Sequence, residues 1–387
     1  MNMSEQISTP DTNHAFYAEG GVSLIEYQAH LIDKGVLVHL GRTTIMNTGV
    51  LLDSAIVDDK LREVAMSRTV IEHKESSFDI GIANATATKG TIVMPATANS
   101  SLDNVGNGYE LAAAAVRYPN HRLVYVASPG QGASSPMSKA DAAYYRQSGR
   151  LVRGAGDDAQ PVDYVVNMYR ALASHGIDIT HLSADSIGNQ FAQALGAAME
   201  PGQLEAGHFS ESTGFVDLGL IEVGKGMVYT EDRKNKAWNI ERSFDPEKLT
   251  DAMQDRYGRA AELYTPIIAK TKIDKSRSSK ADQAKAFWTN LQGLRHGPKH
   301  GDFPLADDAN AMLMRQPQAR LVYSLGELDP LYNGPRSAHD SAQAFLRKLV
   351  LTDGADVRTI LIPDMTHKIN TYFPGLYHAI KRYALFG

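Results

Sequence analysis

Residues 180–189 read Thr180-His181-Leu182-Ser183-Ala184-Asp185-Ser186-Ile187-Gly188-Asn189. The first part is strand-like up to Ser183, and a helix-like pattern starts directly after Ser186. Ala184 stands two residues before Ser186 and Gly188 two residues after it, which is the small-x-Ser-x-Gly pattern of a nucleophile elbow. Such a turn requires small neighbours, because larger side chains would collide with the adjacent strand and helix. The pattern therefore predicts a serine hydroxyl presented at the top of a sheet.

The segments on both sides of this turn alternate between apolar strand-like runs and helix-like runs. We expect strands at residues 90–95, 122–127, 179–183, 204–210, 320–325 and 357–362. We expect helices at residues 109–117, 162–174, 187–199 and 372–385. Alternation of this kind predicts an α/β fold, in which a mostly parallel sheet is covered by helices on both faces.

Three other regions depart from this alternation. Residues 1–20 are expected to form a flexible lead, and residues 21–90 carry short β-leaning runs that favour antiparallel strands and hairpins. Those runs are residues 36–39, 42–46, 69–73 and 78–82. Residues 215–307 are rich in charge and helix formers without a clear core strand, so we expect a helical cap inserted between two sheet strands. The core would then comprise residues 21–214 and 308–387.

The composition narrows the classes of function. The chain has 387 residues, enough for one large α/β domain with an insertion. A net charge of −5 gives no reason to expect nucleic acid or an anionic membrane as a partner. The absence of cysteine excludes disulfides, thiolate metal sites and cysteine nucleophiles. No apolar run approaches the roughly 20 residues of a membrane helix, and the first 14 residues lack a signal-peptide pattern, so a cytoplasmic protein is expected.

A catalytic serine needs a base within hydrogen-bond reach, and that base needs an orienting acid. In a parallel sheet the loops at the carboxyl ends of the strands meet at one edge. The run 320–325 leads into Gly326-Glu327-Leu328-Asp329-Pro330, and the run 357–362 leads into Pro363-Asp364-Met365-Thr366-His367. Asp329 and His367 are therefore the candidate acid and base. Glu327 and Asp364 are weaker alternatives for the acid.

With serine, aspartate and histidine in this order, the chain resembles the α/β-hydrolase fold superfamily. Residues 326–329 are similar to the Gly-Glu-x-Asp run of that family, and His367 lies where the family places its histidine, after the last strand. The loop at residues 128–134 resembles the family's Asp-x-x-Gly-x-Gly-x-Ser loop, with Gly130 and Gly132 in place. The resemblance spans about residues 90–387, with the cap excepted.

The resemblance implies covalent acyl transfer by a serine hydrolase. Ser186 would attack a carbonyl carbon, His367 would take and return the proton, and Asp329 would hold the imidazole tautomer. The substrate class implied is a small-molecule carboxylic ester, while thioesters, amides and acyl transfer require the same residues. No cofactor is implied.

The resemblance also implies an oxyanion hole, which binds the negative oxygen of the tetrahedral intermediate. Its donors would be the backbone N–H of Ile187 and one N–H from the loop after Met94, where Thr97 aligns best. Many relatives have His-Gly in that loop, whereas this chain has Pro95-Ala96-Thr97, which leaves the second donor open. The unusual loop also keeps a second hypothesis open, a non-catalytic binding protein with the hydrolase fold.

Other polar residues favour structural interpretations. His181 and His208 lack the spacing of metal ligands, so we interpret them as packed histidines and expect no metal site. The basic stretch at residues 270–280 is interrupted by Asp274 and lacks aromatic residues, which favours a solvated face over a nucleic-acid site. The strands expected in residues 21–90 leave open whether copies of the chain form a homo-oligomer.

Overall fold

The computed structural model of the chain describes residues 21–22, 64–96, 100–103, 105–210, 284–286, 288–289, 304–326, 345–350, 355–362 and 374–387. Within these ranges, nine strands form one sheet in the order β1-β11-β10-β9-β8-β4-β5-β3-β2. The strands are β1 Gly21–Val22, β2 Met66–His73, β3 Ser76–Ala83, β4 Thr91–Pro95, β5 Arg122–Val126, β8 His181–Asp185, β9 Ala206–Ser210, β10 Arg320–Gly326 and β11 Asp356–Ile362.

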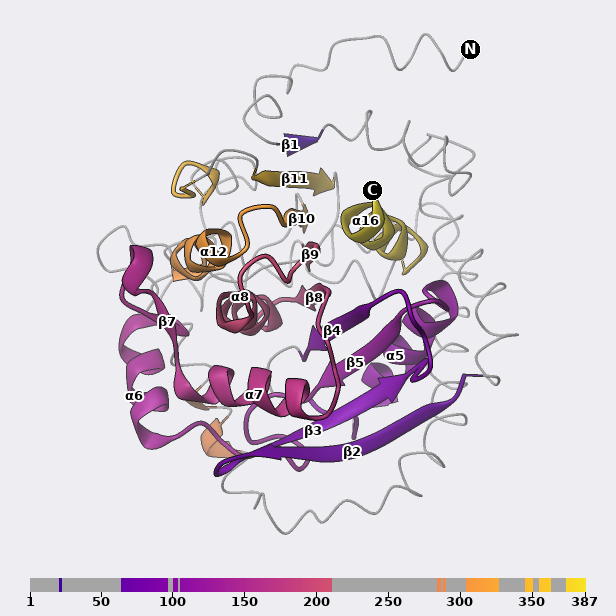
Figure 1. Ribbon diagram of the computed structural model, residues 1–387, viewed down its shortest axis with the longest axis horizontal. Coiled ribbons are helices and arrows are strands. Elements are labelled where there is room, and N and C mark those ends of the chain that lie inside the picture. Colours follow the sequence, from indigo (N-terminus) through magenta and orange to yellow (C-terminus); the bar gives the residue numbers. More distant parts are fainter. Residues whose placement is uncertain are drawn as a thin grey trace, which may run out of the picture.

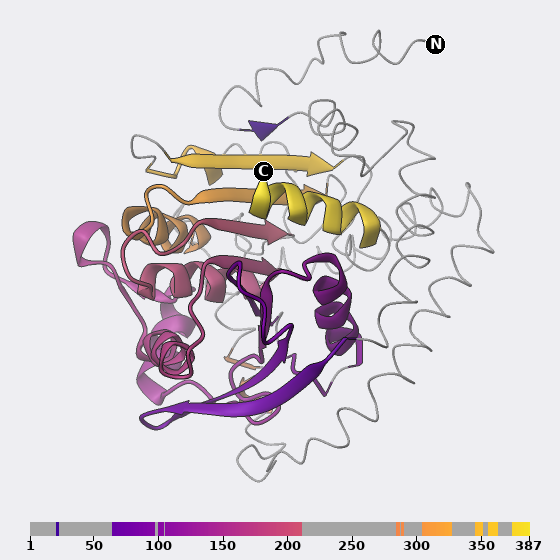
Figure 2. The same ribbon diagram turned by 45° about the vertical axis from the view of Figure 1, so that its right-hand side comes forward.

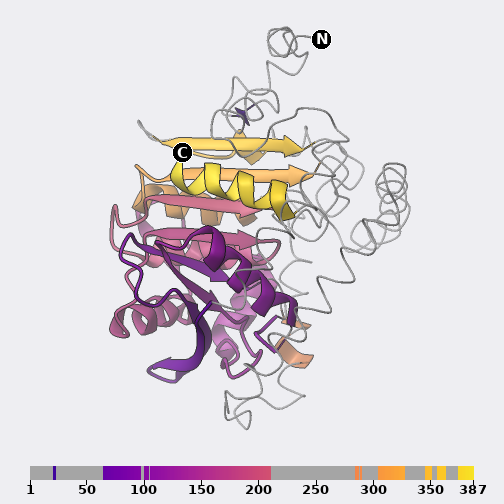
Figure 3. The same ribbon diagram turned by 90° about the vertical axis from the view of Figure 1, so that its right-hand side faces the viewer.

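Seven neighbouring strands, from β1 to β5 in the sheet order, run parallel to one another. Strand β3 is antiparallel to both β5 and β2 and closes that side of the sheet as a hairpin. All residues of β4, β8 and β9 are buried, as expected for parallel strands covered on both faces. Because β8 to β11 are parallel neighbours, their carboxyl ends lie at the same edge of the sheet, which Figures 2 and 3 show.

The described part of the chain contains six α-helices: α5 Val105–Arg117, α6 Lys139–Ser148, α7 Asp163–Ser174, α8 Gly188–Ala198, α12 Pro304–Arg315 and α16 Pro374–Phe386. Helices α7, α8 and α12 lie on one face, and α5 and α16 lie on the other (Figure 1). A two-stranded ribbon of β6 Val152–Arg153 and β7 Gln160–Pro161, with a short 3-10 helix Gly156–Asp158 between them, connects α6 to α7. None of the described helices is long and apolar enough to cross a membrane.

The hydrophobic core is divided by the sheet into two clusters. The larger cluster packs α7, α8 and α12 against the sheet through side chains such as Leu182, Leu195 and Met312. The smaller cluster joins α5 and the last turn of α16 to β4 and β5, through Leu111, Leu123 and Leu385 among others. The expected architecture, a mostly parallel sheet with helices on both faces, is confirmed.

Several boundaries differ from those expected from the sequence. Strand β8 continues to Asp185 rather than ending at Ser183. The side chains of Ser183 and Asp185 are both buried, although both are polar. Helix α5 begins at Val105 rather than at residue 109, and α6 and α12 were not expected from the pattern. The two-residue strand β1 is too short to show any alternation, yet it pairs in parallel with β11.

The N-terminal β-leaning runs are only partly covered by the described residues. The runs 69–73 and 78–82 lie inside the antiparallel pair β2 and β3, as expected. The runs 36–39 and 42–46 lie outside the described residues, as does the N-terminal lead. Of the expected cap, only residues 284–286, 288–289 and 304–307 are described, so the cap stays a prediction.

Candidate active site

The turn between β8 and α8 holds Ser186 in a conformation that residues with a side chain rarely adopt. Its φ is +53°, in the left-handed region, between the last strand residue Asp185 and the first helical residue Gly188. This conformation costs about 1–2 kcal/mol for a residue other than glycine, and it persists only where surrounding contacts impose it. The local backbone is therefore that of a nucleophile elbow.

Hydrogen bonds to the end of β9 impose this conformation. The backbone N–H of Ser186 donates to the carbonyl oxygen of Ser210 at 3.0 Å. The side-chain amide of Asn189 donates to the same oxygen at 2.8 Å. The N–H of Asn189 donates in turn to the carbonyl oxygen of Ser186 at 3.1 Å, which starts the first turn of α8. The elbow is thus fixed to the neighbouring strand on both sides of Ser186.

The two small positions of the elbow differ in how much space they have. A Cβ atom on Gly188 would lie 2.7 Å from the carbonyl oxygen of Pro95 and 3.0 Å from that of Ala96, so only glycine fits without a shift. Ala184 instead packs with its methyl group inside the larger apolar cluster. This explains why alanine is compatible with the first position, while the second requires glycine.

The loop that follows β4 is held at both of its ends. At its start, the N–H of Ala96 donates to the carbonyl oxygen of Val126 at 2.9 Å. At its end, the N–H of Ser100 donates to the hydroxyl oxygen of Ser128 at 3.3 Å, and the N–H of Ser128 donates to the carbonyl oxygen of Ser100 at 2.9 Å. Thr97 lies between these ends, outside the described residues. The described ends of the loop are therefore attached to β5 and to the loop after it.

The glycine-containing loop after β5 is held by a carboxylate from β3. Gly130 and Gly132 have φ values of +73° and +58°. The carboxylate of Asp79 accepts a hydrogen bond from the N–H of Ala133 at 3.1 Å, and it pairs with the guanidinium of Arg68, whose Nε donates to it at 2.8 Å. This loop begins with Ser128, where the Asp-x-x-Gly-x-Gly-x-Ser motif has an aspartate. In this chain the carboxylate that binds the loop comes from Asp79 on β3.

Three buried polar side chains, Asp185, Tyr377 and Lys381, lie together between the elbow and α16. The hydroxyl of Tyr377 on α16 lies 2.8 and 2.9 Å from the two carboxylate oxygens of Asp185. The ammonium of Lys381, one helical turn further, lies 3.5 Å from the same hydroxyl. Burial lowers the pKa of Lys381, whereas the nearby carboxylates of Glu110 and Asp185 act in the opposite direction.

The two histidines considered as ligands are packed into the structure. His208 is fully buried, and its Nε2 lies 3.0 Å from the hydroxyl of Ser324. Burial first, and Lys381 second, hold the pKa of His208 well below its ordinary value, so its imidazole is neutral. His181 lies at the opposite end of β8, where its ring contacts His121 and Phe386. Among the residues that the structure describes, no three histidine, aspartate or glutamate side chains gather as a metal site.

The structure brings some of the sequence-predicted residues to the elbow and leaves others undescribed. Ser186 and Ile187 form the turn, and Ile187 is the N-cap residue of α8. Asp329, His367 and Thr97 lie outside the described residues, as do the alternative acids Glu327 and Asp364. Their roles stay predictions.

No protein-family model matches the sequence, and no curated protein matches it either. Among solved structures, 2-hydroxy-6-oxo-6-phenylhexa-2,4-dienoate hydrolase from Rhodococcus sp. strain RHA1 superposes with a TM-score of 0.50 at 12% identity, over 84% of this chain and 100% of that one. The chain has the α/β-hydrolase fold. A serine hydrolase from Cycloclasticus zankles matches with a TM-score of 0.48 at 12% identity, over 83% of this chain and 99% of that one. An α/β hydrolase from a Medee basin deep-sea metagenome library matches with a TM-score of 0.47 at 12% identity, over 81% and 96%.

Sequence reasoning missed the residues of this hydrolase fold that support the elbow from behind. Tyr377 and Lys381 are separated by four positions on α16, which places both side chains on one helix face. A lysine on the buried face of a terminal helix is an unusual feature that could have been noticed. Its carboxylate partner, Asp185, could not be identified in this way, because it lies 192 positions from Tyr377 in the sequence.

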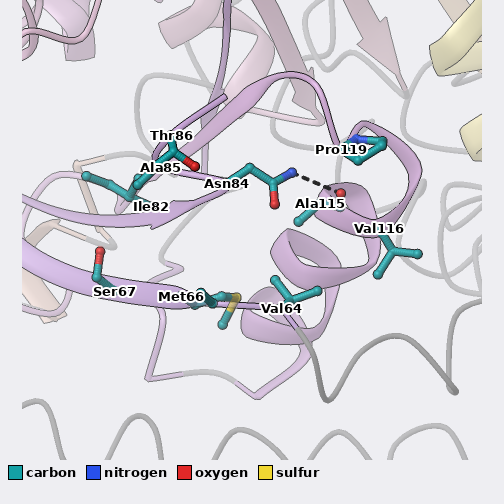
Figure 4. A pocket seen from close by; sticks show the side chains of 11 residues that line it. Val64, Met66, Ser67, Ile82, Asn84, Ala85, Thr86, Ala115, Val116 and Pro119 are labelled. Atoms are coloured by element: carbon teal, nitrogen blue, oxygen red, sulfur yellow. Dashed lines mark hydrogen bonds between the residues drawn. The ribbon is translucent and has the colours of Figure 1, made fainter. Parts of the chain in front are cut away.

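One surface groove of the hydrolase fold lies away from the elbow. It is bounded by β2, β3 and α5 and is shown in Figure 4. Its lining includes Met66, Ile82 and Val116, and the side-chain amide of Asn84 donates to the carbonyl oxygen of Ala115 across one end. Because none of the elbow residues lines this groove, it is a feature of the sheet edge and not of the candidate active site.

Proposed function

We propose that this protein is a serine hydrolase that cleaves a carboxylic ester, or a related thioester or amide, through a covalent acyl-enzyme on Ser186. The observation that carries the proposal is the left-handed backbone of Ser186 at the strand-to-helix turn, with φ of +53°. Lys74 and Asn84 also have positive φ, so what distinguishes Ser186 is that the strained residue is the serine of the small-x-Ser-x-Gly pattern, directly after a buried parallel strand. The strain has a clear use if the turn must project the hydroxyl toward a substrate.

The order of the strands supports His367 as the general base and Asp329 as the orienting acid. Ser186 follows β8 directly, Asp329 follows β10, and His367 follows β11. These strands are parallel and, with β9 between β8 and β10, are consecutive in the sheet. Residues that follow them closely start from the same edge, as a Ser-His-Asp triad requires.

The hydrogen bonds of the β4 loop limit which residues can complete the oxyanion hole. Ile187 stands at the N-terminus of α8, where backbone N–H groups lack helical partners and the helix dipole favours negative charge. Pro95 has no N–H, and the N–H groups of Ala96 and Ser100 are already bonded. These bonds support residues 97–99 as the source of the second donor, and we propose Thr97.

The hydrolase neighbours support hydrolysis as the reaction class. The neighbour from Rhodococcus sp. strain RHA1 is named as a hydrolase of a phenyl-substituted dienoate, which is a small organic acid. We accordingly propose a small-molecule acyl substrate for this chain, held under the cap expected at residues 215–307. The proposed reaction uses only side chains and backbone donors of the chain, so no cofactor is part of it.

Covalent labelling with a fluorophosphonate tests this function. Ser186→Ala is expected to abolish labelling of the folded protein, because the probe reacts only with a serine activated by a neighbouring base. Ser174→Ala is the matched control, since Ser174 is an exposed serine at the end of α7 and should leave labelling unchanged. In the same assay, His367→Ala should lower the labelling rate by about a thousandfold or more.

Folded wild-type protein that is not labelled at all would contradict the hydrolase proposal. It would favour the second hypothesis, a binding protein that retains the hydrolase fold without turnover. Labelling that persists in Ser186→Ala would place the nucleophile on another residue.

A further inference from the structure

The side chain of Asp185, immediately before Ser186, is attached to the C-terminal helix. Both of its carboxylate oxygens lie within hydrogen-bond distance of the Tyr377 hydroxyl, at 2.8 and 2.9 Å. Asp185 is 7% exposed and Tyr377 is 1% exposed, so water competes little for this contact. A hydrogen bond to a carboxylate is about twice as strong as one between neutral groups, and more so when it is buried.

This contact restrains the elbow on a side that the backbone hydrogen bonds do not reach. The N–H of Ser186 is fixed by Ser210 on β9, which lies opposite Asp185 in the parallel register. The carboxylate of Asp185 is fixed by α16, which lies on the face of the sheet opposite α8 (Figure 1) and runs roughly along the strands (Figure 3). The peptide between Asp185 and Ser186 is thus held from the sheet and from the helix, which keeps Ser186 in its unfavourable backbone conformation.

Lys381 completes this group by placing a cation beside the tyrosine. Its ammonium lies 3.5 Å from the Tyr377 hydroxyl and 5.2 Å from the centre of the Tyr377 ring. It also lies 3.6 Å from the sulfur of Met94 on β4, and the lysine is 1% exposed. A carboxylate and an ammonium buried in the same group offset each other's charge, which lessens the penalty for removing either from water.

We propose that Asp185 and Tyr377 are positioning residues that tether the nucleophile elbow to α16. The proposal rests on the proposed function in so far as Ser186 is the reacting group. Tyr377 follows the proposed base His367 by only ten positions in the sequence, on the helix that comes after the base-bearing segment. The contact therefore joins the residue before Ser186 to α16, the helix that follows His367 in the sequence. It limits how far Ser186 and α16 can move relative to each other.

The test compares two tyrosine-to-phenylalanine changes on the same helix. Tyr377→Phe removes the hydroxyl that contacts Asp185, while its ring can stay in place. Tyr383→Phe is the matched control, because its hydroxyl accepts a hydrogen bond from Arg358 at 2.6 Å and its ring lies beside Arg320, the first residue of β10, at the end of that strand away from the elbow. Two quantities are measured for each full-length variant: the second-order rate constant of fluorophosphonate labelling, and the hydrogen-exchange rate of the Ser186 backbone amide.

Tyr377→Phe is expected to slow labelling by about tenfold and to speed exchange of the Ser186 amide, whereas Tyr383→Phe should change either rate by about twofold at most. If 4-nitrophenyl acetate is hydrolysed, kcat should fall for Tyr377→Phe while KM changes little, because the substrate contacts themselves are intact. A role confined to stability would lower the urea midpoint without changing the labelling rate per folded molecule.

Asp185→Asn provides the second variant in case Tyr377→Phe does not fold. It retains an oxygen that can accept from Tyr377 but removes the charge, so its labelling rate should lie between those of wild type and Tyr377→Phe. The double variant Asp185→Asn/Tyr377→Phe should be little slower than Tyr377→Phe alone, because both changes act on one contact.

The possible outcomes separate the tether from the proposed function. Equal labelling rates for Tyr377→Phe and Tyr383→Phe, after correction for the folded fraction, would overturn the tether. If wild-type protein is not labelled, the hydrolase proposal fails while the exchange measurement still decides the tether. In that case faster exchange at Ser186 in Tyr377→Phe supports it, and unchanged exchange overturns it.

Discussion

On strand β9, Phe209 and His208 are neighbours in sequence but point to opposite faces of the sheet. The ring of Phe209 packs against Tyr323 with centroids 5.1 Å apart, inside the apolar cluster beneath α8 and α12. The ring of His208 lies 5.7 Å from that of Tyr377 on α16 and contacts the hydroxyl of Ser324. One strand therefore contributes to an apolar layer on one face and to a polar layer on the other.

The same division holds along the neighbouring strands. On the α8 face the described side chains are apolar or aromatic: Leu182, Ala184, Phe209, Leu321, Tyr323 and Leu325. On the α16 face, Val322 is apolar, but five other buried side chains of these strands are polar: Ser183, Asp185, His208, Ser210 and Ser324. The α8 face provides the apolar burial that stabilises the fold, since apolar area is the main favourable contribution to folding. The α16 face buries polar groups, which must find hydrogen-bond partners inside the protein. It is also the face from which Asp185 restrains the elbow.

The largest expected effect on stability comes from the apolar face. Leu321→Ala removes a fully buried side chain on β10 and should lower the free energy of unfolding by about 3 kcal/mol, through lost transfer energy and the cavity left behind. Urea unfolding at pH 7 measures this loss. The labelling rate per folded molecule should stay that of the wild type, because Leu321 lies at the end of the strand away from the elbow. A large drop in that rate would show that the two faces are not separate in function.

The polar face should make stability depend on pH. Burial first, and His121 second, lower the pKa of His181 from 6.5 to about 4. A hydrogen bond to the backbone of Leu385 acts in the opposite direction and is the smaller contribution. The carboxylate of Glu205 lies 3.8 Å away, but its side chain is 64% exposed, so water screens its charge. Because the unfolded chain takes up the proton at higher pH than the folded one, this contribution is present above pH 6.5 and is lost as the pH falls toward 4.

The protonation of His181 should therefore lower the free energy of unfolding by about 2 kcal/mol as the pH falls from 7 to 5. Urea unfolding at both pH values measures this difference. The variant His181→Gln should flatten the dependence by that amount. An unchanged slope in His181→Gln would mean that the histidine is solvated in the folded protein.

The smallest of the three effects concerns one buried hydrogen bond. Ser324→Ala removes the hydroxyl that contacts Nε2 of His208 and should lower the free energy of unfolding by about 1 kcal/mol. The double variant Ser324→Ala/His208→Leu should recover part of the loss, because no buried ring nitrogen is then left without its partner. A double variant less stable than Ser324→Ala would show that His208 contributes through other contacts, such as its ring contact with Tyr377.

Local sequence was sufficient for the α/β alternation and for the turn at Ser186. Period-two and helical patterns depend on residues close together along the chain, and the small-x-Ser-x-Gly pattern spans only five consecutive residues. The strand order was less accessible, since β1 is two residues long and carries no pattern, although it pairs with β11 near the other end of the chain. The extension of β8 to Asp185 was also missed, because a buried carboxylate at a strand end has no signal in the strand's own pattern.

Long-range contacts set the rest of the candidate site. The requirement for glycine at position 188 comes from the carbonyl oxygens of Pro95 and Ala96, at the end of β4 and more than ninety residues earlier. The contact between Asp185 and Tyr377 joins positions 192 apart, and no periodicity couples them. A pattern can mark a serine for a turn because sterics act between neighbours in the chain. Which hydroxyl, carbonyl or ammonium then lies behind that serine depends on how the layers pack, and packing brings together residues that the sequence keeps far apart.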